Sequence, residues 1–291
     1  MKIFIAIPTY NRAQVFRLSI KSFLNSKLIS GFIVVAQATT SKEAEKYANT
    51  LKELKDSGFE VLHQITNTRL GSVGARNKLI EIAVDTLTKR DIFIMYDDDF
   101  VYPGDYTIKP ISGWLNFNSV GMVGGRVINL RRRRIDPDFA VNIDNLADKL
   151  TEITGFILLD TIHGPREANY TSHPLAFRVE ILQKGVRYDK NYQGTGYREE
   201  SDLQRQIKAL GFKIIFDPRF FVYHLAVETG GNRYSDLQDR MYWKWKNHTY
   251  FMTKWKYPTT KKMLSYIILT TYAILNGLPA IRGIIKAVTS K

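Results

Sequence analysis

The stretch DIFIMYDDDF, from Asp91 to Phe100, is the part of the sequence that decides the fold. Its first six residues, Asp91 to Tyr96, form a short apolar run that predicts a buried β-strand. This strand leads directly into Asp97, Asp98 and Asp99. Three adjacent carboxylates repel one another, so they are hard to explain as a stabilising feature. The stretch therefore predicts a buried strand with a binding site at its end.

Strands and helices alternate on the N-terminal side of this stretch. Apolar runs predict strands at Lys2–Ile7, Phe32–Ala36 and Glu60–His63. Helical patterns follow them after Asn11, at residues 41–56 and at Gly71–Leu87. The alternation is typical of an α/β protein with a Rossmann-like, mostly parallel central sheet flanked by helices.

The first of these helices is expected to begin at Asn11, whose side chain is a suitable N-cap. Pro8 lacks an amide donor, so the first strand should end in a loop just before it. The inner face of the helix should carry apolar residues, namely Val15, Leu18, Ile20, Phe23 and Leu24.

Ligands of parallel sheets bind beyond the carboxyl ends of the strands. Two polar segments are predicted at that edge, PTYNR from Pro8 to Arg12 and the aspartates from Asp97 to Asp99. The tyrosine and polar groups of the first segment would serve a base and a ribose, although they also suit a turn and a helix start. Arg76 would donate to a phosphate or orient the aspartates, although the start of a surface helix explains it nearly as well.

The aspartates Asp97 to Asp99 are predicted to bind a divalent cation and a diphosphate. Two aspartates separated by one residue occur by chance in roughly half of chains of this length. A second such pair, Asp136 and Asp138, follows the arginine run Arg131–Arg134 and has no strand to hold it. The first set follows a strand, and hard oxygen ligands suit Mn²⁺ or Mg²⁺, which bridge to substrate phosphates. The alternative is a solvated acidic turn.

Two later features each have a functional and a structural explanation. The segment REESD, from Arg198 to Asp202, opens a helix predicted to run to Leu210. A glutamate there would accept a proton from an attacking hydroxyl, or the acidic residues would complement the helix dipole. Strands follow at Lys213–Phe216 and Phe220–Tyr223, and His224 ends the second. Its imidazole is either structural or a ligand that completes an oxygen-rich metal shell.

Composition excludes several classes of protein. The 291 residues include no cysteine, so disulfides, thiolate metal sites and a cysteine nucleophile are absent. The 42 Lys and Arg against 28 Asp and Glu give a net charge of +14, which favours anionic partners such as nucleotide phosphates, nucleic acid or acidic lipids. A basic nucleic-acid-binding protein is the competing class, but no helix-turn-helix, zinc or RNA-recognition signature supports it. The first residues do not form a secretory signal, so we expect a cytoplasmic protein.

The segment Met263–Val288 is apolar but interrupted, chiefly at Asn276, Gly277 and Pro279. A membrane span needs about 20 uninterrupted apolar residues, and the longest clean stretch here is shorter. With basic residues at its flanks, the region 261–288 predicts a helix lying on the cytoplasmic face of a membrane with acidic lipids. A terminal helix packed on the core or in a homodimer has nearly equal weight.

An ordered series of motifs resembles the inverting family 2 glycosyltransferases, which have the GT-A fold. The motifs together touch most of residues 1–225, and the series is specific although no single member is. In the family's order they are IAIPTYNR (Ile5–Arg12), GSVGARN (Gly71–Asn77), YDDDF (Tyr96–Phe100), HPLAFRVEIL (His173–Leu182) and GYREESDLQRQIKALGFKIIFDPRFFVYHL (Gly196–Leu225).

The resemblance implies roles for residues that match these motifs. Glu200 falls on the usual position of the general base and Glu199 on its neighbour, although the family commonly has Asp at the base position. The Asp-Asp-Gly-Ser stretch that commonly follows the second strand is absent, and Gln37 would substitute for its acidic residue. The predicted sets are donor-binding Pro8, Thr9, Tyr10, Arg12, Gln37, Arg76, Asp97 and Asp98, metal-binding Asp97, Asp99 and His224, and catalytic Glu200 and Glu199.

The predicted function is a metal-dependent inverting glycosyltransferase that uses a nucleotide-diphosphate sugar and a carbohydrate hydroxyl or lipid-linked phosphate. Residues 1–230 would form the catalytic domain, with a donor-binding half at 1–125 and an acceptor-binding half at 126–230. Residues 231–291 would form a C-terminal helical extension. A catalytically inactive relative that only binds the sugar nucleotide is the alternative.

Overall fold

The computed structural model describes residues 1–130, 144–155, 164–225, 227 and 236–290, with the backbone alone for 144–148. The arginine run Arg131–Arg134 and the aspartate pair Asp136 and Asp138 lie outside the described residues.

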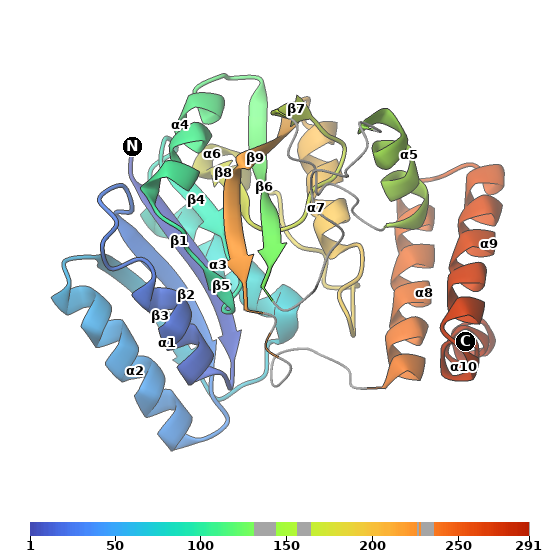
Figure 1. Ribbon diagram of the computed structural model, residues 1–291, viewed down its shortest axis with the longest axis horizontal. Coiled ribbons are helices and arrows are strands. Elements are labelled where there is room, and N and C mark those ends of the chain that lie inside the picture. Colours follow the sequence, from blue (N-terminus) through green and yellow to red (C-terminus); the bar gives the residue numbers. More distant parts are fainter. Residues whose placement is uncertain (131–143, 156–163, 226, 228–235, 291) are drawn as a thin grey trace.

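One mixed sheet forms the centre of the protein (Figure 1). Its order is β3-β2-β1-β4-β8-β6-β9-β5, and β7 also pairs with β9. The first four strands of this order are parallel, whereas β8 runs antiparallel to both β4 and β6. The strands are β1 (Ile3–Tyr10), β2 (Gly31–Gln37), β3 (Glu60–Thr66), β4 (Ile92–Met95), β5 (Phe100–Val101), β6 (Val120–Asn129), β7 (Arg166–Glu167), β8 (Leu175–Arg178) and β9 (Lys213–His224).

Helices cover both faces of the sheet because successive residues of β1 point in opposite directions. Ile3, Ile5 and Ile7 pack against α1 (Ala13–Lys21), α2 (Ser41–Asp56) and α4 (Lys109–Leu115). Phe4 and Ala6 pack on the other face, with α3 (Gly71–Thr86), α6 (Val179–Gln183) and α7 (Glu199–Ala209). The predicted α/β class with a sheet flanked by helices is confirmed. A short 3₁₀ turn (Asp105–Thr107) and α5 (Asp144–Thr154) complete this part.

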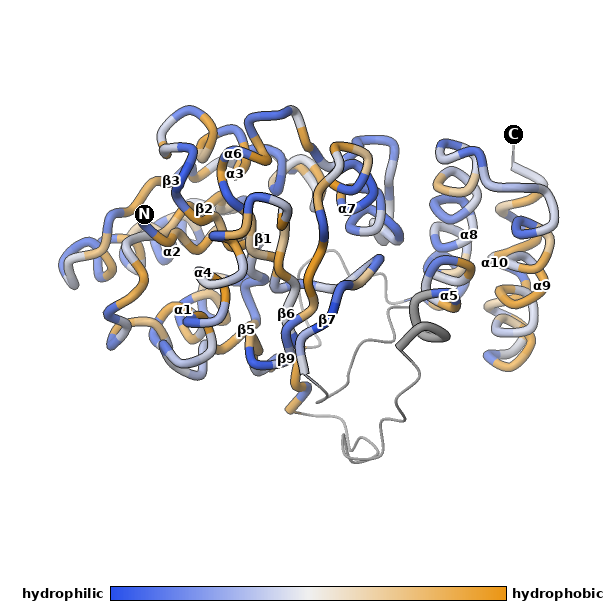
Figure 2. The backbone as a smooth tube through the Cα atoms, turned by 90° about the horizontal axis from the view of Figure 1, so that it is seen from above, coloured by the Kyte–Doolittle hydropathy of each residue, from blue (hydrophilic) through white to orange (hydrophobic). Residues whose placement is uncertain are grey.

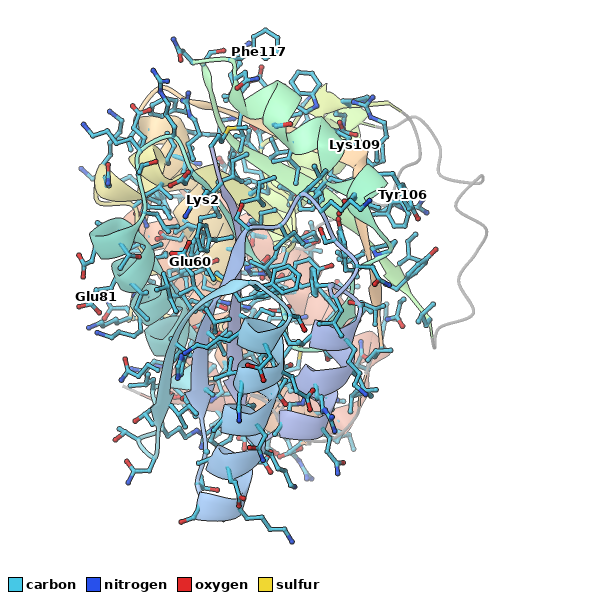
Figure 3. The ribbon with its side chains drawn as sticks, turned by 90° about the vertical axis from the view of Figure 1, so that its left-hand side faces the viewer. Lys2, Glu60, Glu81, Tyr106, Lys109 and Phe117 are labelled. Carbon is cyan, nitrogen blue, oxygen red and sulfur yellow. The ribbon has the colours of Figure 1, made fainter. Side chains whose placement is uncertain are left out.

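Polar contacts join the strands at the end of the sheet opposite the acidic residues, where β1, β3 and β4 begin. Asp91 accepts hydrogen bonds from the amides of Lys2 at 2.7 Å and Thr88 at 2.9 Å, which joins the starts of β1 and β4. Lys2 and Glu60 lie side by side at this end with an N–O distance of 2.8 Å (Figure 3). Asp91, at the start of the stretch that leads to the aspartates, therefore has a structural role.

The start of α1 differs from the prediction. Asn11 has φ of 48° and its side chain accepts from the Thr39 amide, so it does not cap the helix. The helix begins at Ala13. Ile20 and Phe23 are buried and Val15 is partly buried, as predicted, together with Phe16. Leu18 and Leu24 are 59% and 40% exposed, so their predicted burial was wrong.

The two strands predicted near residue 220 are one strand, β9. The register of β9 against β6 shifts between Phe216 and Phe221, where the residues between them lie opposite Gly125. Pro218 lies in this irregular segment, so its missing amide costs no ladder hydrogen bond.

The C-terminal region contains three helices, α8 (Leu237–Lys254), α9 (Thr259–Leu275) and α10 (Leu278–Thr289). The single helix predicted at Met263–Val288 was therefore wrong. Asn276 ends α9, and Gly277 has φ of 88°, which a residue with a side chain rarely adopts. Pro279 then suits the first turn of α10.

The three C-terminal helices stand beside the sheet, and α9 and α10 carry long hydrophobic stretches (Figure 2). Phe251 and Met252 of α8 belong to the apolar core on one face of the sheet, so the C-terminal helices share the core of the sheet domain. None of the described helices combines the length and hydropathy needed to cross a membrane.

Candidate active site

The three aspartates form the turn between β4 and β5. Within this turn the Phe100 amide donates to the Asp97 carbonyl at 3.2 Å. The Leu225 amide donates to the Asp99 carbonyl at 3.0 Å, just after the end of β9. The backbone thus ties the aspartates to His224, as expected if the two ends of these strands form one site.

Asp98 points into the protein rather than toward solvent. Thr9 Oγ1 donates to it at 2.7 Å and Arg12 Nη1 at 2.8 Å. Burial raises the pKa of Asp98 to about 6, although the positive charge of Arg12 opposes this shift. Arg12 also reaches Asp99 at 3.5 Å, so one buried guanidinium pairs with two buried carboxylates.

Asp99 and His224 face each other, with 3.3 Å between Oδ2 and Nε2. Two ligands of one divalent cation lie about 3 Å apart when each is about 2.1 Å from the ion, so this spacing fits a shared metal. The described residues contain no group of three or more His, Asp or Glu side chains that holds a metal by itself. Asp99 and His224 could therefore supply two ligands to a cation.

Asp97 is the most exposed of the three aspartates, with one third of its side chain accessible. Burial alone would raise its pKa, but the charges of His173 and Arg76 outweigh burial and lower it. Arg76 Nη2 lies 3.2 Å from Asp97, and Nη1 of the same guanidinium pairs with Glu199. Arg76 therefore joins the acidic turn after β4 to the first turn of α7.

Glu199 is buried, and it accepts hydrogen bonds from Arg76 and from Ser72 Oγ at 3.1 Å. Burial raises its pKa, and the charge of Arg76 opposes the shift. Its second oxygen, Oε2, is buried and has no hydrogen-bond partner among the described residues. A buried acceptor of this kind costs free energy unless a ligand or water donates to it.

Glu200 has a different environment, with 24% of its side chain exposed. His173 Nδ1 lies 2.7 Å from Glu200 Oε1, and His173 Nε2 lies 3.1 Å from the Tyr188 hydroxyl. Burial raises the pKa of Tyr188 well above its ordinary value, so this hydroxyl keeps its proton. An ionised Glu200 can only accept, so Nδ1 of His173 carries a proton and donates a hydrogen bond to Glu200.

The charge of Glu200 follows from these contacts. Burial raises its pKa, but His173 outweighs burial, and the net pKa of Glu200 lies below the ordinary value. Glu200 is therefore ionised and partly accessible at neutral pH, whereas Glu199 is enclosed and paired with Arg76. A general base needs the first set of properties.

A cavity of about 140 Å³ opens at the carboxyl ends of β1, β2 and β4. Seven of the eight predicted donor-binding residues line it, and the eighth, Arg12, lies beneath Asp98 and Asp99. Gln37 is one of the seven, and its Oε1 accepts from the amides of Leu70 and Gly71, so it also fixes the start of α3. The seven are Pro8, Thr9, Tyr10, Gln37, Arg76, Asp97 and Asp98.

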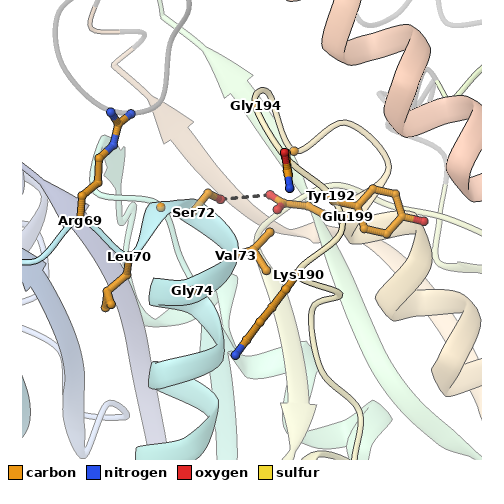
Figure 4. Close-up of a pocket in the computed structure, with 12 residues that line it drawn as sticks. Arg69, Leu70, Ser72, Val73, Gly74, Lys190, Tyr192, Gly194 and Glu199 are labelled. Atoms are coloured by element: carbon orange, nitrogen blue, oxygen red, sulfur yellow. Dashed lines mark hydrogen bonds between the residues drawn. The ribbon is translucent and has the colours of Figure 1, made fainter. Parts of the chain in front are cut away.

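A larger cavity of about 580 Å³ adjoins the first, because Gly71 and Ser72 line both. In Figure 4 Glu199 and Ser72 are joined by their hydrogen bond in its wall, with Tyr192 close to Glu199. Together the two cavities give a continuous site from the ends of β1 and β4 to the start of α7.

Sequence reasoning assigned no role to His173. The residue stands in the motif HPLAFRVEIL, but nothing in that motif indicates its partner. Leu175 pairs with Met95 in the antiparallel β8–β4 ladder, so the start of β8 lies beside the end of β4. This pairing brings His173 to Asp97 and Glu200.

Arg198 anchors the start of α7 with φ of 75°, an unusual value for a residue other than glycine. Its guanidinium donates to the carbonyls of Thr151 and Glu152 at 3.0 and 2.7 Å and to His248 Nδ1 at 3.2 Å. His248 Nε2 contacts Ser265 Oγ of α9. Since arginine stays protonated, His248 must accept at Nδ1 and remain neutral.

This contact predicts a pH dependence of stability. Burial, and then the charge of Arg198, hold the pKa of His248 well below its ordinary value. The stability from neutral His248 is thus present above about pH 6.5 and is lost as the pH falls, by up to about 1.4 kcal/mol per pH unit. Urea unfolding between about pH 7 and pH 5 should show a smaller pH dependence for His248→Gln than for wild type. An equal slope in both proteins would contradict this role.

Comparisons with known proteins give a family and a fold. A family model described as glycosyl transferase family 2 matches residues 4–185. No curated protein matches the sequence.

Solved structures resemble the whole chain. A mannosyltransferase from Pyrobaculum calidifontis, PcManGT, in complex with GDP-Man and Mn²⁺ has a TM-score of 0.61 at 15% identity, and the match covers 100% of this chain and 76% of that one. TarS of S. aureus has a TM-score of 0.58 at 11% identity, over 94% and 43%. GalNAc-T7 with UDP, GalNAc and Mn²⁺ has a TM-score of 0.56 at 15% identity, over 84% and 47%. This chain thus spans less than half of the last two, and identities this low show a shared fold.

Proposed function

Since the chain belongs to glycosyl transferase family 2, we propose that it moves a sugar from a nucleotide-diphosphate sugar to an acceptor, with inversion at the anomeric carbon. The observation that carries the proposal is the bridge made by Arg76 between Asp97 and Glu199. It joins the cavity at the strand ends to the glutamates of α7, so the donor and the base would meet at one place.

The donor nucleotide is proposed to occupy the cavity at the ends of β1, β2 and β4. Tyr10 lies within cation–π distance of Arg69, 5.2 Å from the ring centroid, and would stack on a base. Asp97 and Arg76 would flank the diphosphate. The sugar would enter the larger cavity, where one of its hydroxyls would donate to the unpaired Oε2 of Glu199.

Glu200 is proposed as the general base. Its free carboxylate oxygen takes the proton of the acceptor hydroxyl while the acceptor oxygen attacks the anomeric carbon. The bond from the anomeric carbon to the diphosphate oxygen breaks in the same step. The nucleoside diphosphate leaves with the electron pair. His173 is a positioning residue, because its Nδ1 fixes the Glu200 carboxylate. For a lipid-linked phosphate acceptor, an ionised phosphate would attack without this deprotonation.

Asp99 and His224, with Asp97, are proposed to hold Mn²⁺ or Mg²⁺ together with the diphosphate. Their oxygen and imidazole donors fit such an ion, and the 3.3 Å spacing of Asp99 and His224 allows both to bind it. A bound cation would neutralise negative charge on the departing diphosphate. The acceptor is proposed to be a carbohydrate or a lipid-linked molecule at a membrane surface.

A thermal-shift panel of UDP, GDP, dTDP and CMP sugars, with Mn²⁺ or with EDTA, tests the donor site. A nucleotide at about one hundred times its Kd adds about 2.7 kcal/mol of stability, which raises Tm by roughly 5–10 °C. We expect one nucleotide to give this shift and EDTA to remove it. Failure of every nucleotide to raise Tm would count against the donor site. Hydrolysis of the bound donor would separate an active enzyme from an inactive relative.

A further inference from the structure

The inner faces of α9 and α10 are built from small residues. α9 buries Ser265, Leu269 and Ala273. α10 buries Ala280, Gly283, Ile284 and Ala287. Most of these side chains are short, and α10 approaches α8 so closely that a Cβ at Gly283 would lie 2.3 Å from the Gln238 carbonyl oxygen. The helix of a globular protein normally turns its larger apolar residues inward.

The large apolar side chains of the two helices lie on the opposite side, which we call the outer face. Each is between 46% and 81% exposed. Half of the strongly exposed large apolar residues in the described chain are on these two helices, and the positions in α9 recur at helical spacing. The outer face consists of Met263, Leu264, Ile267, Ile274, Leu275, Leu278, Ile285 and Val288.

The charges on α9 and α10 are all positive, and two of these cations pair with carboxylates of other helices, Lys261 with Glu152 and Lys286 with Asp239. From Arg240 to Lys291 the sequence contains ten Lys and Arg and no Asp or Glu. Lys262 lies beside the start of the α9 stripe, and Arg282 is exposed on α10. An apolar face with cations around it and no carboxylates on its own helices matches the chemistry of an acyl-chain boundary beneath phosphate headgroups.

We propose that the outer face of α9 and α10 lies in the interface of a membrane that contains anionic lipids. The two helices would bury their apolar residues at the level of the acyl chains, with Lys262 and Arg282 near the phosphates. Neither helix is long enough to span, so the contact is peripheral.

Charge argues against a second copy of this chain as the occupant. A symmetric dimer through the outer face would place the cations of one copy beside those of the other, and the chain as a whole has a net charge of +14. An anionic bilayer turns the same cations into favourable contacts.

The helices that would touch the membrane are joined to the proposed active site. The ring of Trp243 in α8 lies so close to Gly194 that a Cβ there would come within 2.1 Å of it, and Gly194 lines the larger cavity. Ser265 of α9 contacts His248, which accepts from Arg198 beside Glu199. These contacts would place a lipid-linked acceptor near the site, and that step rests on the proposed function. The membrane contact itself does not depend on it.

Vesicle flotation of the full chain tests the proposal. Vesicles of phosphatidylcholine with phosphatidylglycerol should bind the protein at least tenfold more tightly than phosphatidylcholine alone. The double variant Ile267→Gln/Leu275→Gln should lose at least tenfold in binding, because it removes two apolar anchors. Lys262→Gln/Arg282→Gln should lose about fivefold per charge on the anionic vesicles only.

Leu18→Gln is the matched control, since Leu18 is 59% exposed on α1 and Ile267 is 61% exposed on α9. This variant should bind vesicles as wild type does, and all variants should keep the wild-type Tm. The proposal is overturned if the wild-type protein does not bind anionic vesicles, or if Ile267→Gln/Leu275→Gln binds them as tightly as wild type does. A dimer in light scattering that Ile267→Gln/Leu275→Gln abolishes, without vesicle binding, would also overturn it. The Tm shift caused by nucleotide is measured in the same variants. It tests the donor site alone, so failure of the membrane proposal can be told apart from failure of the proposed function.

Discussion

Glu200→Gln should lower kcat by about 10²–10⁴-fold, with little change in donor affinity or Tm. The substitution keeps the size of the side chain and removes the proton acceptor. Glu200 is the accessible glutamate of the pair, and His173 holds its pKa below the ordinary value, so wild type has the base ionised at neutral pH. Release of nucleoside diphosphate from the donor chosen by the thermal-shift panel is the measurement.

Two variants show whether the effect belongs to Glu200. Glu199→Gln removes the partner of buried Arg76, so it should lower Tm and weaken donor binding as well as activity. Glu180→Gln changes an exposed glutamate of α6 that pairs with Lys184, and it should behave as wild type. Wild-type turnover by Glu200→Gln would rule out Glu200 as the base.

Arg12→Met should cost about 3–5 kcal/mol of stability, because it leaves Asp98 and Asp99 buried without their shared cation. For a chain of this size the loss corresponds to a fall in Tm of roughly 10 °C. Thermal unfolding in EDTA measures it, and added Mn²⁺ should recover part of the loss if a cation binds at Asp99. Arg17→Met is the control, since Arg17 of α1 forms an exposed pair with Glu53 of α2, and the substitution should cost less than about 1 kcal/mol.

Lower pH should also reduce the loss of stability caused by Arg12→Met. The pKa of Asp98 is raised by burial to about 6 in the folded protein, against about 3.9 when unfolded. The stability from protonated Asp98 is therefore fully present below about pH 3.9 and is lost as the pH rises through about 6. The difference in Tm between Arg12→Met and wild type should shrink at about pH 5. A difference that grows on acidification would show that Arg12 does not serve to neutralise Asp98.

The sequence predicted the class of fold from local patterns. The apolar run before Asp97 and the alternation of strands and helices indicate a sheet flanked by helices, because side-chain period follows directly from backbone geometry. The predictions were wrong where a tertiary contact competed with a local sequence preference. Asn11 was predicted to cap α1, but its side chain bonds Thr39. Leu18 was predicted to face inward, but it lies on the opposite side of the helix from buried Phe16 and is exposed.

The roles within the acidic turn depended on tertiary structure. Asp97, Asp98 and Asp99 are equivalent in sequence, yet Asp98 is buried against Thr9 and Arg12 while Asp97 is exposed to the cavity. Successive residues of a turn point in different directions, and only the packing of β1 beside β4 decides which direction leads inward.

The sequence by itself determined that this chain has a strand ending in carboxylates, a later helix opening with two glutamates, and a basic, apolar C-terminal region. Tertiary structure decided that these parts meet. The antiparallel insertion of β8 beside β4 brings His173 to Glu200, and the Arg76–Glu199 pair spans 123 residues. Such contacts depend on the order of strands in the sheet, which the periodicity of a single segment does not encode.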